Sequence, residues 1–430
     1  MINDNILINL IDILKGILTE ASIIEDAYIV GGAVRDILIG KPVTDIDLAI
    51  NRDPYIIASL FARSIKGTYV PLNIKFETAR VVKDGYIFDI SMLHHGSLEE
   101  DVKRRDFTIN ALAIKLSDND RQIIDLVDGI RDTNNKIIRM ISRDNLIADP
   151  LRLIRAFRFM SSLGFHIDNV TLKAVSELKY LIKLPAVERI YTELKILLSS
   201  DNAFDALNSM AETGLLTELI PEIKPSEIES RLKIFKEMEA IINNPQGLPY
   251  FRQMRQYFSS QPHIKILLKI STLFINDLAQ IKGVIERFKV SQKETRYINI
   301  ITGNICKNNL CPYFYHTKKI DMARFLMRID GHLYSIFALC LCIVRVLRRQ
   351  DEDRFMKSAS DLFSYYNNEY IPLSKEPHLI NGDDLEDIFG LVPSEQFRVI
   401  LNMVEEKRLC GEISSKDEAV KVVERFLIDN

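Results

Sequence analysis

The sequence predicts a mixed α/β unit at the N-terminus, followed by a long and mostly helical remainder. Short apolar runs typical of β-strands recur between residues 26 and 116, whereas helical spacing of apolar residues takes over after about residue 145. The chain has 430 residues, and roughly 150 residues per domain suggests about three units rather than one core. Its 47% hydrophobic and 27% charged residues exclude a disordered, collagen-like or coiled-coil chain.

Residues 1–20 predict an amphipathic first helix. Asp4, Asp12 and Lys15 interrupt its apolar positions, so the stretch lacks the basic start and the uninterrupted apolar centre of a secretory signal. We therefore expect a cytoplasmic protein. The nearest approach to a membrane span, residues 334–344, is cut short by Arg345, so we expect a buried helix there and no membrane partner.

The runs predicted to be strands are short and rich in β-branched and aromatic residues, which favour an extended backbone. They cover residues 27–30, 45–50, 68–72, 79–82, 86–91 and 111–116. Further on, Leu151, Ile154, Phe157 and Met160 recur at three-residue steps, as on one side of a helix. Glycine and proline residues break the helical part near residues 164, 185, 221–225, 244–249, 308–312 and 372–382.

The net charge of −3 is distributed unevenly along the chain. Residues 136–195 contain 11 lysine and arginine residues against 6 acidic ones, whereas residues 381–430 contain 6 against 12. A basic middle and an acidic end indicate an elongated protein that binds a polyanion along one stretch only.

Residues 28–50 predict a strand, a glycine turn, a short helix and a second strand. Gly31 and Gly32 follow the first strand and precede the helix, so backbone N–H groups there can approach phosphate oxygens without interference from a Cβ atom. The N-terminus of the helix adds a partial positive charge. Arg35 follows about one turn later, close enough to contact the same anion.

On the second strand, Asp45 and Asp47 alternate with Ile46 and Leu48. Because successive side chains of a strand point to opposite faces, both carboxylates are expected on one face. Two neighbouring carboxylates repel each other unless a cation neutralises them, and their oxygens suit a hard divalent cation. A solvated edge strand of alternating charge is the alternative, which the preceding glycine turn disfavours. Asp89 occupies another strand-like run, and a neighbouring strand could bring it beside the pair.

These parts together predict nucleotidyl transfer with Mg²⁺ as the cofactor. In such chemistry one ion lowers the pKa of an attacking hydroxyl group and another stabilises the leaving pyrophosphate. We assign the catalytic role to Asp45, Asp47 and Asp89, with Asp45 and Asp47 as the metal ligands.

The run GGAVRD at residues 31–36, followed by Asp45 and Asp47, resembles the GGxVRD and DxD motifs of the tRNA nucleotidyltransferase and bacterial poly(A) polymerase family. The resemblance implies an α/β nucleotidyltransferase head followed by an all-α neck, body and tail. It also implies that the neck selects nucleotides and that the body and tail bind tRNA. We place the head at residues 1–145, the neck at 146–205, the body at 206–370 and the tail at 371–430.

The run RRDFTINA at residues 104–111 resembles a second block of the family. In the family this block binds the incoming nucleotide and senses its ribose hydroxyl. The resemblance therefore implies nucleotide-binding roles for Arg104, Arg105, Asp106 and Asn110, beside those of Gly31, Gly32 and Arg35. On chemistry alone, the Arg-Arg-Asp run would be only a charged turn.

Residues 149–159 predict a helix with one polar row, which resembles the third block of the family. Asp149, Arg152, Arg155 and Arg158 follow one another at three-residue steps, so neighbours in the row lie side by side. An aspartate followed one turn later by an arginine presents acceptors and donors together, as reading the edge of a base requires. In the family these two residues select CTP or ATP without a nucleic-acid template, and the later arginines meet the triphosphate. Without the other two blocks, a salt-bridged amphipathic helix would be the preferred interpretation.

Residues 187–194 (VERIYTEL) resemble a further block, to which we assign a structural role. Two departures from the family pattern affect the prediction. Ala148 precedes Asp149 where the family usually has a glutamate, so the residue that braces the base-selecting arginine is missing or replaced. Only 14 residues separate Asp89 from Arg104, whereas relatives that switch from CTP to ATP generally carry a longer flexible loop there. Addition of two C residues alone is therefore a hypothesis beside complete CCA addition.

We expect an enzyme that adds C and/or A residues to the 3′ end of tRNA from CTP and ATP. A poly(A) polymerase is the closest alternative, because it shares the three blocks, although the acidic C-terminus disfavours it. A catalytically silent RNA-binding relative would be expected to lose its metal ligands, and both aspartates of the DxD motif are present. A small-molecule nucleotidyltransferase would have no need for the second and third blocks.

Overall fold

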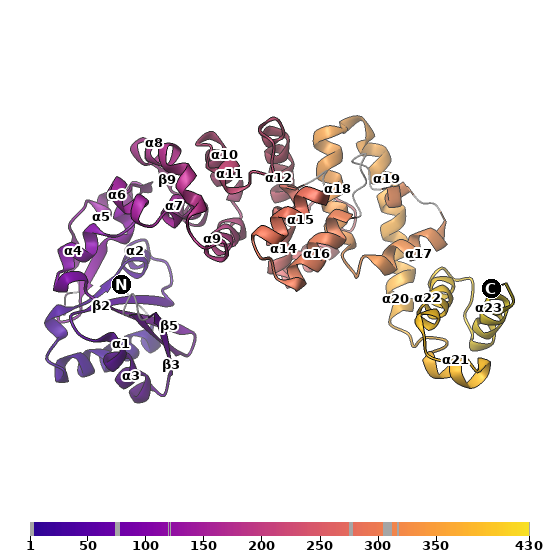
Figure 1. The fold of residues 1–430 in the computed structure, drawn as a ribbon, viewed down its shortest axis with the longest axis horizontal. Helices are drawn as coiled ribbons and strands as arrows, with labels where there is room; N and C mark the ends of the chain where they lie inside the picture. The colour runs from indigo at the N-terminus through magenta and orange to yellow at the C-terminus, as the bar shows by residue number, and fades with distance from the viewer. Residues whose placement is uncertain are drawn as a thin grey trace. The chain divides into compact units, whose positions relative to one another are not determined.

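The computed structural model describes residues 4–73, 78–118, 120, 122–274, 278–303, 312–315 and 318–429. The chain divides into two compact units, Met1–Leu219 and Ile220–Asn430. Every strand of the described chain lies in the first unit, and the second unit is built of helices (Figure 1). The predicted fold class, an α/β head followed by a helical remainder, is confirmed.

The first unit is built on a seven-stranded sheet. Its strands lie in the order β3-β4-β5-β2-β1-β6-β7, and only β2 and β5 are parallel neighbours. All six predicted strands are present within one residue of their predicted bounds. β7 and the separate pair β8 and β9 were not predicted, because two or three residues are too few to show an alternating pattern. The strands are β1 (Ala27–Val30), β2 (Asp45–Ile50), β3 (Thr68–Asn73), β4 (Thr78–Lys83), β5 (Tyr86–Met92), β6 (Leu112–Lys115), β7 (Ile123–Asp125), β8 (Ile137–Ile138) and β9 (His166–Ile167).

One face of this sheet carries the hydrophobic core of the head. Figure 1 shows α1 (Asn5–Glu20) and α3 (Pro54–Ile65) on one side of the sheet, where α1 packs on α3 and α3 packs on β3, β4 and β5. The buried ring of Phe88 on β5 meets the ring of Phe61 on α3 edge-on, with 5.0 Å between the centroids. The opposite face of β2 and β5 carries Asp45, Asp47 and Asp89, beside a small apolar cluster that includes Ala49.

The predicted helix of the third block is α7 (Leu151–Leu163), and it ends at Gly164, whose φ of +69° favours glycine. It packs against α9 (Val187–Ser199) and α10 (Ala203–Glu212). The other helices of the first unit are α2 (Gly32–Leu38), α4 (Leu98–Lys103), α5 (Gly129–Asn134), α6 (Arg143–Ala148), α8 (Asn169–Leu178) and α11 (Leu215–Leu219).

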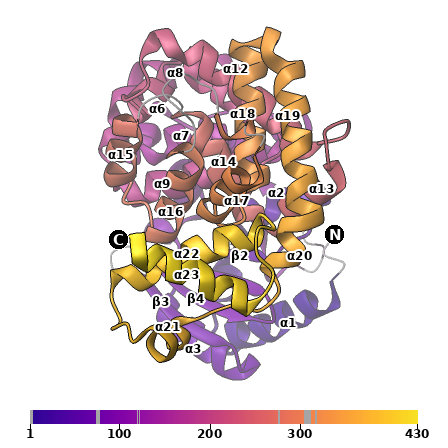
Figure 2. The ribbon, with the colours of Figure 1, turned by 90° about the vertical axis from the view of Figure 1, so that its right-hand side faces the viewer.

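The second unit is organised around α18 (Leu333–Leu347), which is buried from Leu333 to Val344. This helix was predicted from its apolar run, and α12 and α19 flank it (Figure 2). α21, α22 and α23 enclose a smaller core of their own. The remaining bounds are α12 (Ile228–Asn243), α13 (Phe251–Ser260), α14 (Pro262–Thr272), α15 (Leu278–Arg287), α16 (Gln292–Gly303), α17 (Lys319–Arg328), α19 (Glu352–Tyr365), α20 (Ile371–Ser374), α21 (Gly382–Phe389), α22 (Glu395–Leu409) and α23 (Lys416–Asp429).

Within the described ranges, no single helix is long and apolar enough to cross a membrane. Only α17 and α18 together would reach the required length and composition, and they are bent by 102° relative to each other.

Gly129, the first residue of α5, provides a test of packing in the head. An added Cβ atom would lie 2.3 Å from the carbonyl oxygen of Thr108 and 2.9 Å from a methyl group of Leu112. We predict that Gly129→Ala lowers the free energy of unfolding by about 1–3 kcal/mol, because backbone must move to admit the methyl group. Urea unfolding followed by circular dichroism measures the change.

Gly16→Ala is the matched control for this prediction. Gly16 lies within α1, and an added Cβ atom there would meet nothing within 4 Å. Since alanine favours a helix over glycine by about 1 kcal/mol, this substitution should be neutral or stabilising. Equal losses from the two substitutions would contradict the packing argument.

Candidate active site

The turn between β1 and α2 depends on Gly31 for two independent reasons. Its φ of +78° lies in the region that L side chains avoid. An added Cβ atom would also lie 3.0 Å from the Arg105 guanidinium and 3.1 Å from an Asp47 carboxylate oxygen. The Gly31 N–H group donates to the carbonyl oxygen of Leu112 at 3.1 Å. The amides that remain for an anion are therefore those of the first turn of α2, which Gly32 opens.

Asp45 and Asp47 lie on the same face of β2, as the alternation predicts. Both are exposed, whereas Ile46 and Leu48 between and beside them are buried in the core. Desolvation of the carboxylate raises the pKa of Asp47, and the negative charges of Asp89 and Asp45 raise it further, against the opposing effect of Arg105. A cation at this face would relieve that repulsion, so the two carboxylates fit a divalent metal ion chemically.

Asp89 lies beside Asp47, because β2 and β5 are parallel and these two residues are partners in the register. Both of its carboxylate oxygens, however, accept hydrogen bonds from Arg80, at 2.7 and 2.8 Å. Arg80 lies opposite Asp89 on β4. Among the described residues, no three His, Cys, Asp or Glu side chains converge to hold a metal ion. A cation would therefore rely on Asp45, Asp47 and oxygen atoms of a bound substrate.

The sequence interpretation missed Arg80, although a local signal exists. Asp84 and Gly85 form a two-residue hairpin turn with φ values of +50° and +86° between β4 and β5. Arg80 precedes this turn by four residues and Asp89 follows it by four. Equal distances from a hairpin turn place two residues opposite each other, so the pair was predictable from the Asp-Gly dipeptide.

Asp101 on α4 holds the two arginines of the second block. Its side chain is 1% exposed, and one oxygen accepts two hydrogen bonds from Arg104 while the other accepts two from Arg105, at 2.7 to 3.0 Å. Burial by itself would raise the pKa of Asp101, but Arg105 and Arg104 outweigh it, and the pKa lies below its ordinary value. Sequence reasoning assigned this residue no role, because a carboxylate four residues before an arginine is common on helix surfaces.

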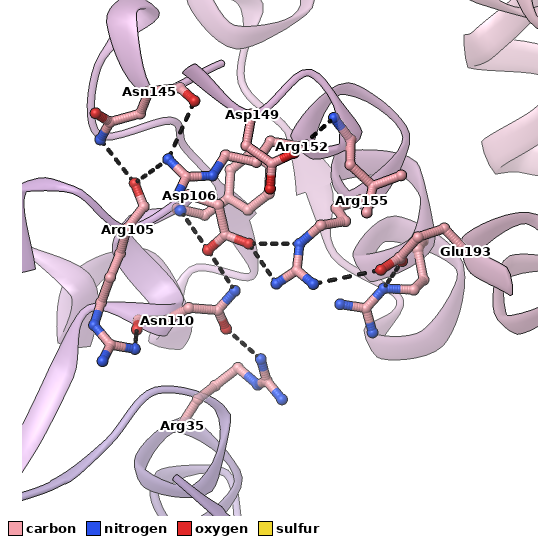
Figure 3. Close-up of polar contacts among 12 residues, drawn as sticks. Arg35, Arg105, Asp106, Asn110, Asn145, Asp149, Arg152, Arg155 and Glu193 are labelled. Atoms are coloured by element: carbon pink, nitrogen blue, oxygen red, sulfur yellow. Dashed lines mark hydrogen bonds and ion pairs between the residues drawn. The ribbon is translucent and has the colours of Figure 1, made fainter. Parts of the chain in front are cut away.

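Asp106 is the centre of a buried hydrogen-bonded chain (Figure 3). One of its oxygens accepts two hydrogen bonds from Arg155, at 2.6 and 2.9 Å, and the other accepts from the Asn110 amide at 3.0 Å. The Asn110 side-chain oxygen in turn accepts from Arg35 at 2.5 Å. Burial opposes ionisation of Asp106, but Arg155 and the hydrogen bonds outweigh it and lower its pKa to about 2. The second block is thereby joined to both α2 and α7.

Glu193 on α9 receives the arginines of the third block. Its side chain is 11% exposed, and it lies 3.4 Å from the Arg155 guanidinium and 2.6 Å from that of Arg158. Arg158 also lies over the ring of Phe159, 3.9 Å from its centroid. Glu193 belongs to the block to which the sequence analysis gave a structural role, so its contact with the site arginines was not anticipated.

Asp149 and Arg152 lie at the junction between α6 and α7. Arg189 on α9 approaches an Asp149 oxygen at 3.5 Å. The Arg152 guanidinium donates to two backbone carbonyl oxygens, those of Asn145 at 3.1 Å and Arg105 at 3.4 Å. Both side chains face the same cavity as the residues described above.

That cavity has a volume of about 690 Å³, within the usual range for sites that bind small molecules. Its lining is dominated by arginine and aspartate side chains. It brings together every residue assigned to the site from the sequence: Gly31, Gly32, Arg35, Asp45, Asp47, Asp89, Arg104, Arg105, Asp106, Asn110, Asp149, Arg152, Arg155 and Arg158.

Comparisons with known proteins match both family models and relatives to this chain. The family described as the poly A polymerase head domain matches residues 27–97 and 91–139, and the probable RNA and SrmB-binding site of polymerase A matches residues 164–227. The chain is similar to the CC-adding tRNA nucleotidyltransferase of Synechocystis sp., at 28% identity over 405 residues and 92% of each chain. It is equally similar to the CCA-adding enzyme of Streptococcus sanguinis, at 28% identity over 413 residues and 92% of each chain.

Two solved structures share the fold. A CCA-adding enzyme in complex with ATP has a TM-score of 0.72 and 23% identity, and the match covers 99% of this chain and 96% of the other. The Thermotoga maritima CCA-adding enzyme in complex with tRNA has a TM-score of 0.70 and 22% identity, with 99% and 97% covered.

Removing the Asp106 carboxylate should make the free energy of unfolding less dependent on pH between about pH 4 and 2. Because its pKa is about 2 in the folded chain and 3.8 ordinarily, its charge stabilises the fold above about pH 4 and this contribution is lost as the pH falls toward 2. We predict that Asp106→Asn costs about 2 kcal/mol or more at pH 7, and that the difference from wild type narrows between pH 4 and 2. Urea unfolding across this range measures it, with the exposed Asp144→Asn as control. A difference that stays constant with pH would contradict the assignment.

Arg80→Gln should strengthen cation binding, because it leaves Asp47 and Asp89 side by side without the guanidinium. We predict about tenfold tighter Mn²⁺ binding to the full-length chain, equivalent to about 1.4 kcal/mol. Electron paramagnetic resonance of free Mn²⁺ measures the affinity. Arg80→Gln combined with Asp89→Asn should return to the wild-type value, and Arg63→Gln, an exposed arginine on α3, serves as the charge control. No gain in affinity from Arg80→Gln would show that Arg80 does not compete with the cation.

Proposed function

We propose that this chain, which belongs to the family of tRNA nucleotidyltransferases and bacterial poly(A) polymerases, adds C and/or A residues to the 3′ end of tRNA from CTP and ATP without a nucleic-acid template. The observation that carries the proposal is the single cavity in which the residues of all three sequence blocks meet. Relatives that match 91–92% of the chain carry the names of CC-adding and CCA-adding enzymes.

Enzymes of this class use divalent metal ions, and we propose Mg²⁺ at Asp45 and Asp47. The donor set supports this choice, because both side chains are acidic, exposed and on one face of β2, and Mg²⁺ prefers one or two carboxylates with substrate phosphates. When bound, it would neutralise charge on the triphosphate and lower the pKa of the attacking 3′ hydroxyl group. Asp89 stays a candidate catalytic carboxylate, and its use would require Arg80 to release it.

The arginines of the cavity suit a nucleoside triphosphate. We propose that Arg35, Arg155 and Arg158 meet the phosphates, together with the amides of the first turn of α2, which Gly31 and Gly32 leave free of side chains. Their guanidinium groups offer several donors in a fixed geometry, which suits phosphate oxygens. Asp106 has both oxygens engaged by Arg155 and Asn110, so we propose that it acts by holding those two residues.

Other residues of the cavity are candidates for contact with the sugar and the base. We propose that Arg104, Arg105 and Asn110 meet the ribose, and that Asp149 and Arg152 read the base edge. Asp101 holds the two arginines of the second block in fixed positions. The proposal therefore needs no large rearrangement of these side chains before a nucleotide binds.

We keep the four-part division as a proposal, with a catalytic head (1–145), a nucleotide-selecting neck (146–205), and a body (206–370) and tail (371–430) that bind tRNA. The match of residues 164–227 to a probable RNA-binding site supports an RNA partner. We propose the cytoplasm as the location, since a tRNA substrate would be met there.

A narrower function, addition of two C residues only, is favoured by the connection between β5 and the second block. Of the 14 residues between Asp89 and Arg104, the first three complete β5 and the other 11 include the turn His94–Gly96 and α4. The Leu93 N–H group donates to the Ile50 carbonyl oxygen at 2.8 Å. His95 adopts a positive φ of 49° within this tight turn. Such a short, hydrogen-bonded connection leaves no long loop to support a change from CTP to ATP.

The test is incorporation on three tRNA transcripts: one that lacks CCA, one that lacks only the final A, and one that is complete. Each is incubated with Mg²⁺ and CTP, ATP or both. We predict two C residues on the first transcript with CTP, and Asp45→Asn with Asp47→Asn should abolish addition, with the exposed Asp144→Asn as control. A full CCA end from CTP and ATP would exclude the narrower function. Long A tracts would indicate a poly(A) polymerase, and no incorporation would contradict the enzymatic proposal.

A further inference from the structure

Arg152 lacks the acidic neighbour that the family pattern leads one to expect. Ala148, an exposed residue at the end of α6, occupies the position where relatives usually carry a glutamate. The Arg152 guanidinium is nevertheless held in place, because it donates to the carbonyl oxygens of Asn145 and Arg105. These two carbonyl groups are therefore the elements that orient the arginine in this chain.

The side chain of Asn145 controls one of these carbonyl groups directly. Its amide nitrogen donates to the carbonyl oxygen of Arg105 at 2.8 Å (Figure 3). The same nitrogen donates to the carbonyl oxygen of Lys103 at 2.6 Å. The Arg105 carbonyl oxygen thus receives two donors, the Asn145 amide and the Arg152 guanidinium. Asn145 supplies the second carbonyl group for Arg152 from its own backbone. One half-buried residue therefore links α6, the second sequence block and the first turn of α7.

This connection has a geometric consequence for base selection. Asp149, the proposed partner of Arg152, follows Asn145 by one helical turn, and its N–H group donates to the Asn145 carbonyl oxygen at 3.2 Å. Both proposed base-reading residues are thus bonded to the backbone of Asn145. Discrimination between bases by hydrogen bonds depends on donors and acceptors held at fixed positions.

We propose that Asn145 is a positioning residue for nucleotide selection, which orients Arg152 in place of the missing glutamate. Its side-chain amide holds the Arg105 carbonyl oxygen where it can accept from Arg152. The inference rests on the proposed function and adds to it a residue outside the three recognised blocks. CTP and UTP are the discriminating pair of ligands, because they have the same size and differ only in the polar groups of the base edge.

The experiment compares kcat and KM for CTP and for UTP on a tRNA that lacks CCA, using the full-length wild type, Asn145→Ala and Asn145→Leu. Leucine has a similar volume and no donor, so it separates loss of the hydrogen bonds from loss of packing. We expect both variants to raise the KM for CTP about tenfold and to lower the ratio of kcat/KM for CTP over UTP by a similar factor. The KM for tRNA should stay unchanged. Wild-type discrimination in either variant would overturn the proposal.

Ser142→Ala is the matched control. The Ser142 hydroxyl oxygen accepts the Asn145 N–H group at 3.2 Å and caps the N-terminus of α6, without contact to the Asn145 side-chain amide. We expect this variant to lose thermal stability but to keep the CTP to UTP ratio. If Ser142→Ala lowers the ratio of kcat/KM for CTP over UTP as much as Asn145→Ala does, general weakening of α6 explains the effect and the proposal fails.

Equilibrium binding separates this inference from the proposed function. Titration calorimetry with CTP and with UTP on wild type and Asn145→Ala requires no turnover. If wild type incorporates no nucleotide, the proposed function fails. The ratio of the affinities for CTP and UTP then decides the role of Asn145. A ratio unchanged by Asn145→Ala would then overturn the inference.

Discussion

The ion pair between the buried Asp106 and the half-buried Arg155 joins the segment after β5 to α7, and the order of the cavity follows from it. A buried charge without a partner is costly, so every charged group drawn into the interior requires another. Arg155 consequently meets Glu193 as well, and Asn110 bridges from Asp106 to Arg35. Residues from α2, α7 and α9 are thereby held around one space that is large enough for a nucleotide.

The sheet supplies the second constraint. Side chains alternate across a strand, so when β2 buries Ile46 and Leu48 in the core it must direct Asp45 and Asp47 to the opposite face, where the cavity lies. The parallel pairing of β2 with β5 then places Asp89 next to Asp47, and the hairpin to β4 delivers Arg80 to Asp89. The head thus presents Asp45 and Asp47 to the cavity and holds Asp89 in an ion pair with Arg80.

In this chain, backbone carbonyl groups orient Arg152, at a place where the family pattern has a glutamate side chain. With Ala148 in place of a glutamate, Arg152 depends on carbonyl oxygens, and Asn145 places one of them. Carbonyl groups carry no net charge, so these two contacts do not neutralise the Arg152 guanidinium. At Asp101, one carboxylate fixes both Arg104 and Arg105.

The sequence by itself determined those features that depend on local periodicity and on single backbone requirements. The alternation of residues 45–48, the need for glycine at Gly31 and the three-residue steps from Asp149 to Arg158 follow from the geometry of strands, turns and helices, and all were predictable. β7, β8 and β9 were missed because they are too short to show a period. The partners of the site residues, such as Glu193 and Asn145, were decided only by the tertiary structure. They lie about 40 residues from the groups they hold, and no local pattern specifies which distant side chain will meet a buried charge.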